Sequence, residues 1–147
     1  ITVERGSNVQ ENCIIHVFPG KDVLLKEGSH IGHGAVIHGA TIEPNCLVGM
    51  NAVVMDDAVI GKESIIGALT FIKQGTQVPQ RSVYAGNPGK KVKDVSDEML
   101  KWKTEGTQWY KDLPESFRNS LLSCEPLAED NLNRPRGKGG FSPLKSS

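Results

Sequence analysis

The chain has 147 residues, of which 17 are basic and 17 acidic, so its formal net charge at pH 7 is zero. A chain of this length forms one domain with appendages, and its balanced charge does not predict binding to nucleic acid or an anionic membrane. No apolar run approaches the roughly 20 residues of a membrane span and no leader peptide is visible, so we expect a cytoplasmic protein.

A six-residue repeat runs from Val3 to Thr76. Branched aliphatic residues are spaced by six, except for a ten-residue step after Ile15 and a five-residue step after Ile37. Four positions after each aliphatic, apart from Ile15, comes a small residue. The aliphatics are Val3, Val9, Ile15, Leu25, Ile31, Ile37, Ile42, Val48, Val54, Ile60, Ile66 and Ile72, and the small residues are Ser7, Cys13, Ser29, Ala35, Thr41, Cys46, Ala52, Ala58, Ser64, Thr70 and Thr76.

A period of six fits neither an α-helix nor one long alternating strand. It fits short strands joined by tight corners, with an aliphatic side chain pointing into a narrow core and a small residue at each bend. Three such sides close a coil of about 18 residues, and stacked coils pair as parallel strands. The sequence therefore predicts an all-β solenoid over residues 1–87, with residues 17–24 bulging out as a loop.

The chain beyond the repeat is predicted to be helical over residues 88–124. A turn at Asn87–Gly89 ends the repeat, and Ser96 is a helix N-cap followed by two acidic residues. We expect a helix over 97–113, then a second short helix after Pro114, and an extended or disordered tail over 125–147. The first helix carries Met99, Trp102, Trp109 and Leu113 as an apolar stripe, and the second carries Phe117, Leu121 and Leu122.

The three cysteines do not suggest a disulfide framework. Cys13 and Cys46 occupy small corner positions of the repeat, and Cys124 lies near the tail. All three are predicted to be reduced thiols.

Two histidines occupy equivalent positions in the repeat. His16 follows Ile15 and His38 follows Ile37, and these aliphatics lie three repeats apart, which is one full coil. If the loop bulges out, the two histidines stack on one side with backbones roughly 4.8 Å apart. Two imidazoles that close together can share one metal ion.

A third histidine, His33, lies two residues after Ile31 and so belongs to the preceding side of the coil. One subunit cannot easily bring all three together, but a homotrimer can, if a neighbouring copy supplies His33. Three imidazoles with an open fourth position are typical of catalytic zinc, although iron or cobalt would also fit. His30 has no stacked partner, so a supporting role is preferred for it. The alternative is that these are ordinary surface histidines in turns.

Several short motifs accompany the histidines, namely Asn8-Val9-Gln10-Glu11 before His16, Ile31-Gly32-His33 before His38-Gly39, and Val48-Gly49-Met50. Together they resemble the γ-class carbonic anhydrase family, whose members are left-handed parallel β-helices. The carboxy-terminal region carries Val95-Ser96-Asp97-Glu98, Trp102-Lys103, Gly106-Thr107, Tyr110 and Leu113. It is similar to the branch named for phenylacetate degradation and carnitine operons.

The resemblance implies a trimeric zinc enzyme that hydrates carbon dioxide to bicarbonate. It implies that Gln10 and Asn8 orient the attacking hydroxide and the substrate, with Glu11 in the shell around them. Two departures from the family are expected to matter. The loop at residues 17–24 has only Asp22 as an acid to carry protons. The family also has earlier coils before the position that matches Ile1, and the present sequence does not include them.

Two other functions remain open. The same metal site could hydrolyse acyl-CoA thioesters, which makes an acyl-CoA the alternative small-molecule partner. The chain could also form a trimer that the metal stabilises without catalysis. A hexapeptide acyltransferase is a more remote fourth hypothesis, because such enzymes do not need three clustered histidines.

Overall fold

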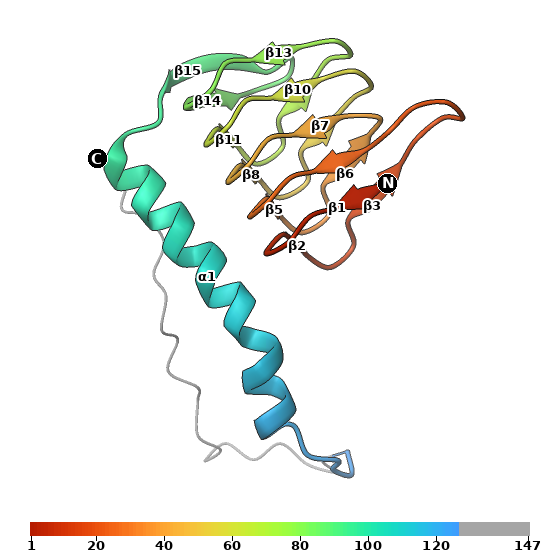
Figure 1. Ribbon diagram of the computed structural model, residues 1–147, viewed down its shortest axis with the longest axis vertical. Helices are drawn as coiled ribbons and strands as arrows, with labels where there is room; N and C mark the ends of the chain where they lie inside the picture. Colours follow the sequence, from red (N-terminus) through yellow and green to blue (C-terminus); the bar gives the residue numbers. More distant parts are fainter. Residues whose placement is uncertain (127–147) are drawn as a thin grey trace.

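The computed structural model describes residues 1–126, which form a parallel β-solenoid of about five turns followed by one α-helix (Figure 1). Three sheets make the sides of the solenoid, and from β1 to β14 each sheet takes every third strand. The first sheet contains β1 (Thr2–Val3), β4 (Leu24–Leu25), β7 (Thr41–Ile42), β10 (Val59–Ile60) and β13 (Gln77–Val78). The second contains β2 (Asn8–Val9), β5 (His30–Ile31), β8 (Leu47–Val48), β11 (Ile65–Ile66), β14 (Ser82–Ala85) and β15 (Lys90–Asp94). The third contains β3 (Ile14–His16), β6 (Val36–His38), β9 (Val53–Val54) and β12 (Phe71–Ile72).

From Leu25 onward the repeat aliphatics form the core, as the sequence predicts, whereas Val3 and Val9 of the first coil are exposed and Ile15 is only partly buried. Ile37 pairs with Val54 in the next coil, and Ile31 pairs with Val48 in the same way. From Leu25 to Val54 and on to Ile72, these side chains are at most 1% exposed. Because each coil presents only one bulky side chain per side, the core is a narrow column that the stacked strands enclose.

The corners of the coil use small residues, with one difference from the prediction. Cys46 and Ala52 are fully buried, and the residue before each of them has a left-handed backbone, with φ of 56° at Asn45 and 55° at Asn51. Thr41, predicted as a corner residue, instead lies half-buried in β7, and Ala40 is the buried small residue. Because the step from Ile37 to Ile42 is five residues instead of six, the corner comes one position earlier. The small side chain that points inward is therefore Ala40, two places before Ile42.

The loop predicted over residues 17–24 is found between β3 and β4 as residues 17–23 and projects to one side (Figure 1), but its last residue, Val23, is buried in the core, and Leu24 belongs to β4. Lys21 Nζ lies 2.6 Å from Asp57 Oδ1, which ties the loop to the solenoid.

The last coil ends in a hairpin rather than passing directly into a helix. β15 pairs antiparallel with β14, so the segment 88–124, predicted to be helical, begins with a strand. The hairpin occupies the edge of the second sheet, which would otherwise leave the backbone of β14 unpaired.

One helix, α1 (Asp97–Ser120), follows the hairpin. Ser96 caps it, with its hydroxyl accepting from the Met99 amide, as predicted. The predicted break at Pro114 is wrong, because α1 continues through Pro114 for six more residues. A proline removes one backbone hydrogen bond, but its own φ is helical, so the turns on either side can continue. Leu121 and Leu122 lie beyond the helix end and are exposed.

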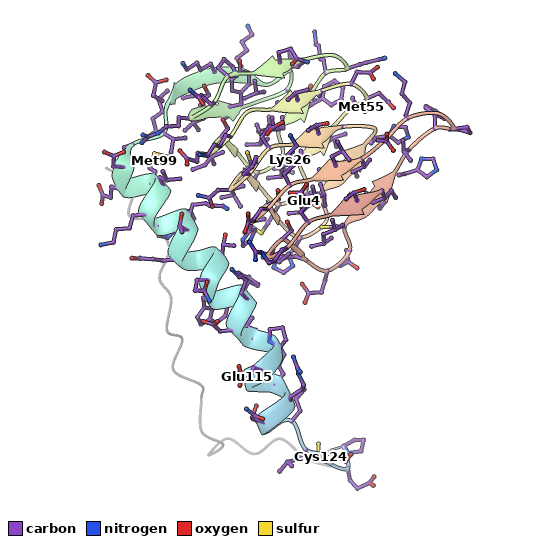
Figure 2. All side chains as sticks on the ribbon, viewed as in Figure 1. Glu4, Lys26, Met55, Met99, Glu115 and Cys124 are labelled. Carbon is purple, nitrogen blue, oxygen red and sulfur yellow. The ribbon has the colours of Figure 1, made fainter. Side chains whose placement is uncertain are left out.

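α1 lies along the second sheet of its own chain and extends beyond the first coil (Figure 1). It begins near Met99 beside the solenoid, whereas Glu115 lies on its distant part (Figure 2). The buried residues of α1 are Lys103, Gly106 and Thr107, so the predicted apolar stripe is only partly covered. Lys103 donates to the Gly28 carbonyl at 2.7 Å.

All three cysteines are unpaired, as predicted, and burial raises the pKa of the Cys46 thiol to about 12. Within residues 1–126, no helix has the length and apolar character needed to cross a bilayer. Most of the tail predicted over 125–147 lies outside the described residues.

Candidate metal site and adjoining pocket

His16 and His38 stack as the repeat predicts. β3 and β6 pair in parallel with His16 opposite His38, and His16 Nδ1 lies 3.0 Å from His38 Nε2. Two nitrogens that bind one zinc ion at about 2.0–2.1 Å in a tetrahedral arrangement lie roughly 3.3 Å apart. The spacing of the pair is close to that value, and in this structure the two nitrogens share a hydrogen bond.

A carboxylate orients one of these rings. His38 donates from Nδ1 to Asp56 Oδ2 at 2.9 Å, and the Asp56 side chain is only 10% exposed. This bond leaves the lone pair on His38 Nε2, the nitrogen that faces His16. Asp56 was not predicted from the sequence. The available signal was the register, because Asp56 follows Val54, which pairs with Ile37 beside His38.

An aromatic ring covers the histidine pair. Phe18, from the loop at residues 17–23, lies with its ring centroid 4.9 Å from that of His38 and 6.3 Å from that of His16. Its position was also not predicted. The loop therefore brings an apolar surface to a pair of polar rings.

His33 lies on the second side of the solenoid, where the structure brings it to two of the predicted site residues. Its Nδ1 is 2.8 Å from Glu11 Oε2, and its backbone N–H donates to Gln10 Oε1 at 3.1 Å. Across residues 1–126, no three His, Cys, Asp or Glu side chains are arranged to hold a metal. A single chain thus presents the pair and the third histidine separately.

His30 contacts both Gln10 and Asn8, the remaining residue predicted for the site. Its Nε2 lies 2.8 Å from Gln10 Nε2 and its Nδ1 lies 3.3 Å from Asn8 Nδ2, so Asn8 contacts His30. Burial lowers the pKa of His30 to about 4, with the charges of Lys103 and His33 adding to the effect. The ring is therefore neutral near pH 7.

A neutral imidazole has one donor and one acceptor nitrogen. If Gln10 donates to His30 Nε2, then Nδ1 carries the proton and Asn8 must present its carbonyl oxygen. That rotation also gives a partner to Asn8 Oδ1, which is buried and otherwise unbonded. His30 therefore holds both predicted amides in place, which agrees with the supporting role expected for it.

A pocket of about 430 Å³ lies beside His33, between α1 and the second sheet. Trp102, Trp109 and Tyr110 line it from the helix, and Gln10 and His33 line it from the solenoid. The Tyr110 ring also meets His30 edge-on, with centroids 5.0 Å apart. Trp102 and Trp109, predicted as part of the apolar stripe of the helix, thus form one wall of a cavity together with Tyr110.

Comparison with known proteins identifies the family. Carnitine operon protein CaiE of Proteus sp. (strain LE138) is 42% identical over 139 residues, which is 95% of this chain and 71% of that protein. The chain belongs to the CaiE family of hexapeptide-repeat proteins. The CaiE protein of Escherichia coli (strain K12) is 43% identical over the same share of each chain.

Two further matches agree with this family. Residues 39–74 match the model described as bacterial transferase hexapeptide (six repeats). A crystal structure of a hexapeptide transferase family protein from Anaplasma phagocytophilum has a TM-score of 0.74 and 28% identity, covering 78% of this chain and 68% of the other. The predicted resemblance to the carnitine-operon branch is thereby confirmed, and none of these matches assigns a reaction to the site.

Proposed function

We propose that this CaiE-like chain forms a homotrimer that binds zinc between subunits and hydrates carbon dioxide to bicarbonate, in the manner of a γ-class carbonic anhydrase. The observation that supports it most directly is the His16–His38 pair, with two ring nitrogens 3.0 Å apart and Asp56 orienting one ring. Iron or cobalt would also suit three imidazoles.

His16 and His38 would hold the metal from one subunit, and His33 of the neighbouring subunit would complete the set. Zinc with three imidazoles and an open position supplies hydroxide near neutral pH, because it lowers the pKa of its water to about 7. The separation of His33 from the pair within one chain supports a site that is assembled between subunits.

The other predicted residues would act around His33. Glu11 accepts from His33 Nδ1 at 2.8 Å, which leaves the lone pair on His33 Nε2 for the metal. Gln10 is held by His30, and its amide has a second hydrogen that can be donated to an oxygen at the site. Asn8 would contribute through His30, since its contact is with that ring.

Hydrolysis of acyl-CoA thioesters is the second candidate. The pocket beside His33 favours it, because about 430 Å³ is far more room than carbon dioxide needs. The same three histidines would serve both reactions.

The test compares two reactions on zinc-loaded protein whose metal content has been measured. Stopped-flow hydration of carbon dioxide and hydrolysis of acetyl-CoA are followed for the wild-type chain and for His38→Ala. Hydration that depends on His38 supports the proposal, and thioester hydrolysis that depends on His38 supports the second candidate. Metal binding and a trimer without either rate would identify a metal-stabilised trimer with no catalysis, and both enzymatic functions would fail.

A further inference from the structure

The pocket between α1 and the solenoid has more room than the proposed reaction requires. A water molecule occupies about 30 Å³ in the liquid, and carbon dioxide is a molecule of only three heavy atoms. A pocket of about 430 Å³ instead falls within the range of roughly 300–1,000 Å³ that is typical of sites for small organic ligands.

The pocket is apolar over most of its wall. Trp102, Trp109 and Met50 contribute large apolar surfaces, whereas Gln10 and His33 place polar groups at the side of the candidate metal site. Such a wall, with few polar groups gathered at one place, is typical of a site that binds an apolar body and orients one polar group.

Glycines keep part of the pocket floor free of side chains. A Cβ atom at Gly32 would lie 2.9 Å from the Val48 carbonyl oxygen, and one at Gly49 would lie 2.5 Å from the Ala68 amide nitrogen. Close stacking of the coils therefore requires glycine at both positions. Bare backbone faces α1 there, and the space remains open.

The charges around the pocket favour an uncharged ligand. None of the residues that line it, all within the described part of the chain, is acidic. Lys103 is the lining cation, but its ammonium is buried and already donates to Gly28 O at 2.7 Å and to Asn45 Oδ1 at 2.6 Å. His30 is neutral near pH 7. A charged ligand would thus lose its hydration without gaining a free partner.

We propose that this pocket binds the uncharged, apolar part of a small-molecule substrate whose reacting carbonyl lies beside Gln10 and His33. The inference rests on the proposed metal site and deepens the second candidate reaction, because it specifies an acyl compound with an aliphatic or aromatic body as the substrate. It goes beyond carbon dioxide hydration because it assigns a role to the aromatic face of α1.

Binding can be measured directly, because the only two tryptophans of the chain, Trp102 and Trp109, both line the pocket. The probe is N-phenyl-1-naphthylamine, an uncharged aromatic amine whose binding quenches tryptophan emission by energy transfer. We expect saturable binding of one probe per subunit to the full 147-residue chain, with or without zinc.

Two variants test the location. Ala68→Phe fills the pocket and Met50→Glu places a carboxylate in it, and each should weaken probe binding at least tenfold. Leu69 is the matched control, because it is adjacent to Ala68, 72% exposed and outside the pocket. Leu69→Phe and Leu69→Glu should leave binding within twofold of wild type, and circular dichroism confirms that all four variants are folded.

Turnover by the zinc-loaded protein connects the pocket to the site. The ratio of kcat/KM for 4-nitrophenyl hexanoate to that for 4-nitrophenyl acetate should exceed ten in wild type and fall at least tenfold in Ala68→Phe. Equal ratios in the two proteins, or the absence of probe binding because a neighbouring subunit fills the pocket, would overturn the inference. Failure of the proposed function is a separate result. The wild-type chain would then bind no zinc, or would show no turnover, while the probe would still bind to it and to His38→Ala.

Discussion

His38 donates from Nδ1 to Asp56 Oδ2 at 2.9 Å, across two neighbouring coils of the solenoid. The contact is nearly buried, with the His38 side chain 17% exposed and the Asp56 side chain 10% exposed. Because the carboxylate fixes the proton on Nδ1, the Nε2 lone pair faces His16. A hydrogen bond to a carboxylate also makes an imidazole a stronger ligand.

Asp56→Asn should therefore weaken metal binding. Removing a side chain that orients a metal ligand typically lowers the metal affinity about 10–100-fold, and we expect a loss in that range. The dissociation constant for zinc is measured by competition with a chromophoric chelator. Asp112→Asn is the control, because Asp112 is an exposed carboxylate on α1 that accepts from Gln108. Equal zinc affinities in the two variants would show that Asp56 does not support the site.

Subunits that each lack one ligand should complement one another. His16→Ala and His33→Ala are dissociated separately, mixed and reassembled, and the zinc content of the mixture is compared with that of each variant alone. If the ligands come from different subunits, mixed trimers contain intact interfaces and recover part of the wild-type zinc. Recovery no greater than in the separate variants would contradict a shared site.

Burial of His30 should make the metal-free protein less stable in mild acid. The pKa of His30 is about 4 in the fold and near 6.5 when unfolded, so the unfolded chain binds the proton first as the pH falls. Above pH 6.5 the ring is neutral in both states, and this contribution to the free energy of unfolding is complete. Between pH 6.5 and 4 the unfolded chain takes up the proton, and the free energy of unfolding falls by about 3 kcal/mol. Urea unfolding at several pH values measures it.

His30→Gln is the matched variant for that experiment. Glutamine can accept from Gln10 and donate to Asn8, but it does not titrate. The difference in unfolding free energy between the two proteins should change by a few kcal/mol from pH 7 to pH 4. Parallel curves would mean that His30 is not the group responsible.

The aliphatic column should dominate the stability of the solenoid. Ile60 is fully buried in β10, and Ile60→Ala should lower the free energy of unfolding by about 2–5 kcal/mol because it leaves a cavity. Val92→Ala, at a side chain that is 62% exposed on β15, should change it by less than about 0.5 kcal/mol. Urea denaturation compares the two. Similar losses would show that the column is not the main source of stability.

Local pattern was enough to predict the features that depend on the repeat. The spacing of Ile15 and Ile37 predicted that His16 and His38 would stack, and the offset of His33 predicted that it would lie elsewhere. Both follow because a six-residue repeat assigns each side chain to one side of the coil. The same rule failed at Thr41, where one missing residue moved the corner to Ala40.

Features that depend on long-range contacts could not be predicted in this way. Lys103 lies on α1, but its partners Gly28 and Asn45 are 75 and 58 residues away in the chain. No local pattern indicates which face of the solenoid the helix will cover. The continuation of α1 through Pro114 likewise contradicts the usual local rule for proline.

The sequence by itself determined the coil, the direction of each repeat side chain and the pairing of His16 with His38, because the repeat restricts the backbone to one geometry. Only the tertiary structure decided that Asp56 orients His38 and that Trp102 and Trp109 enclose a pocket beside His33. The Asp56–His38 contact depends on the offset between neighbouring corners of the solenoid. The pocket depends on where the buried Lys103 holds α1.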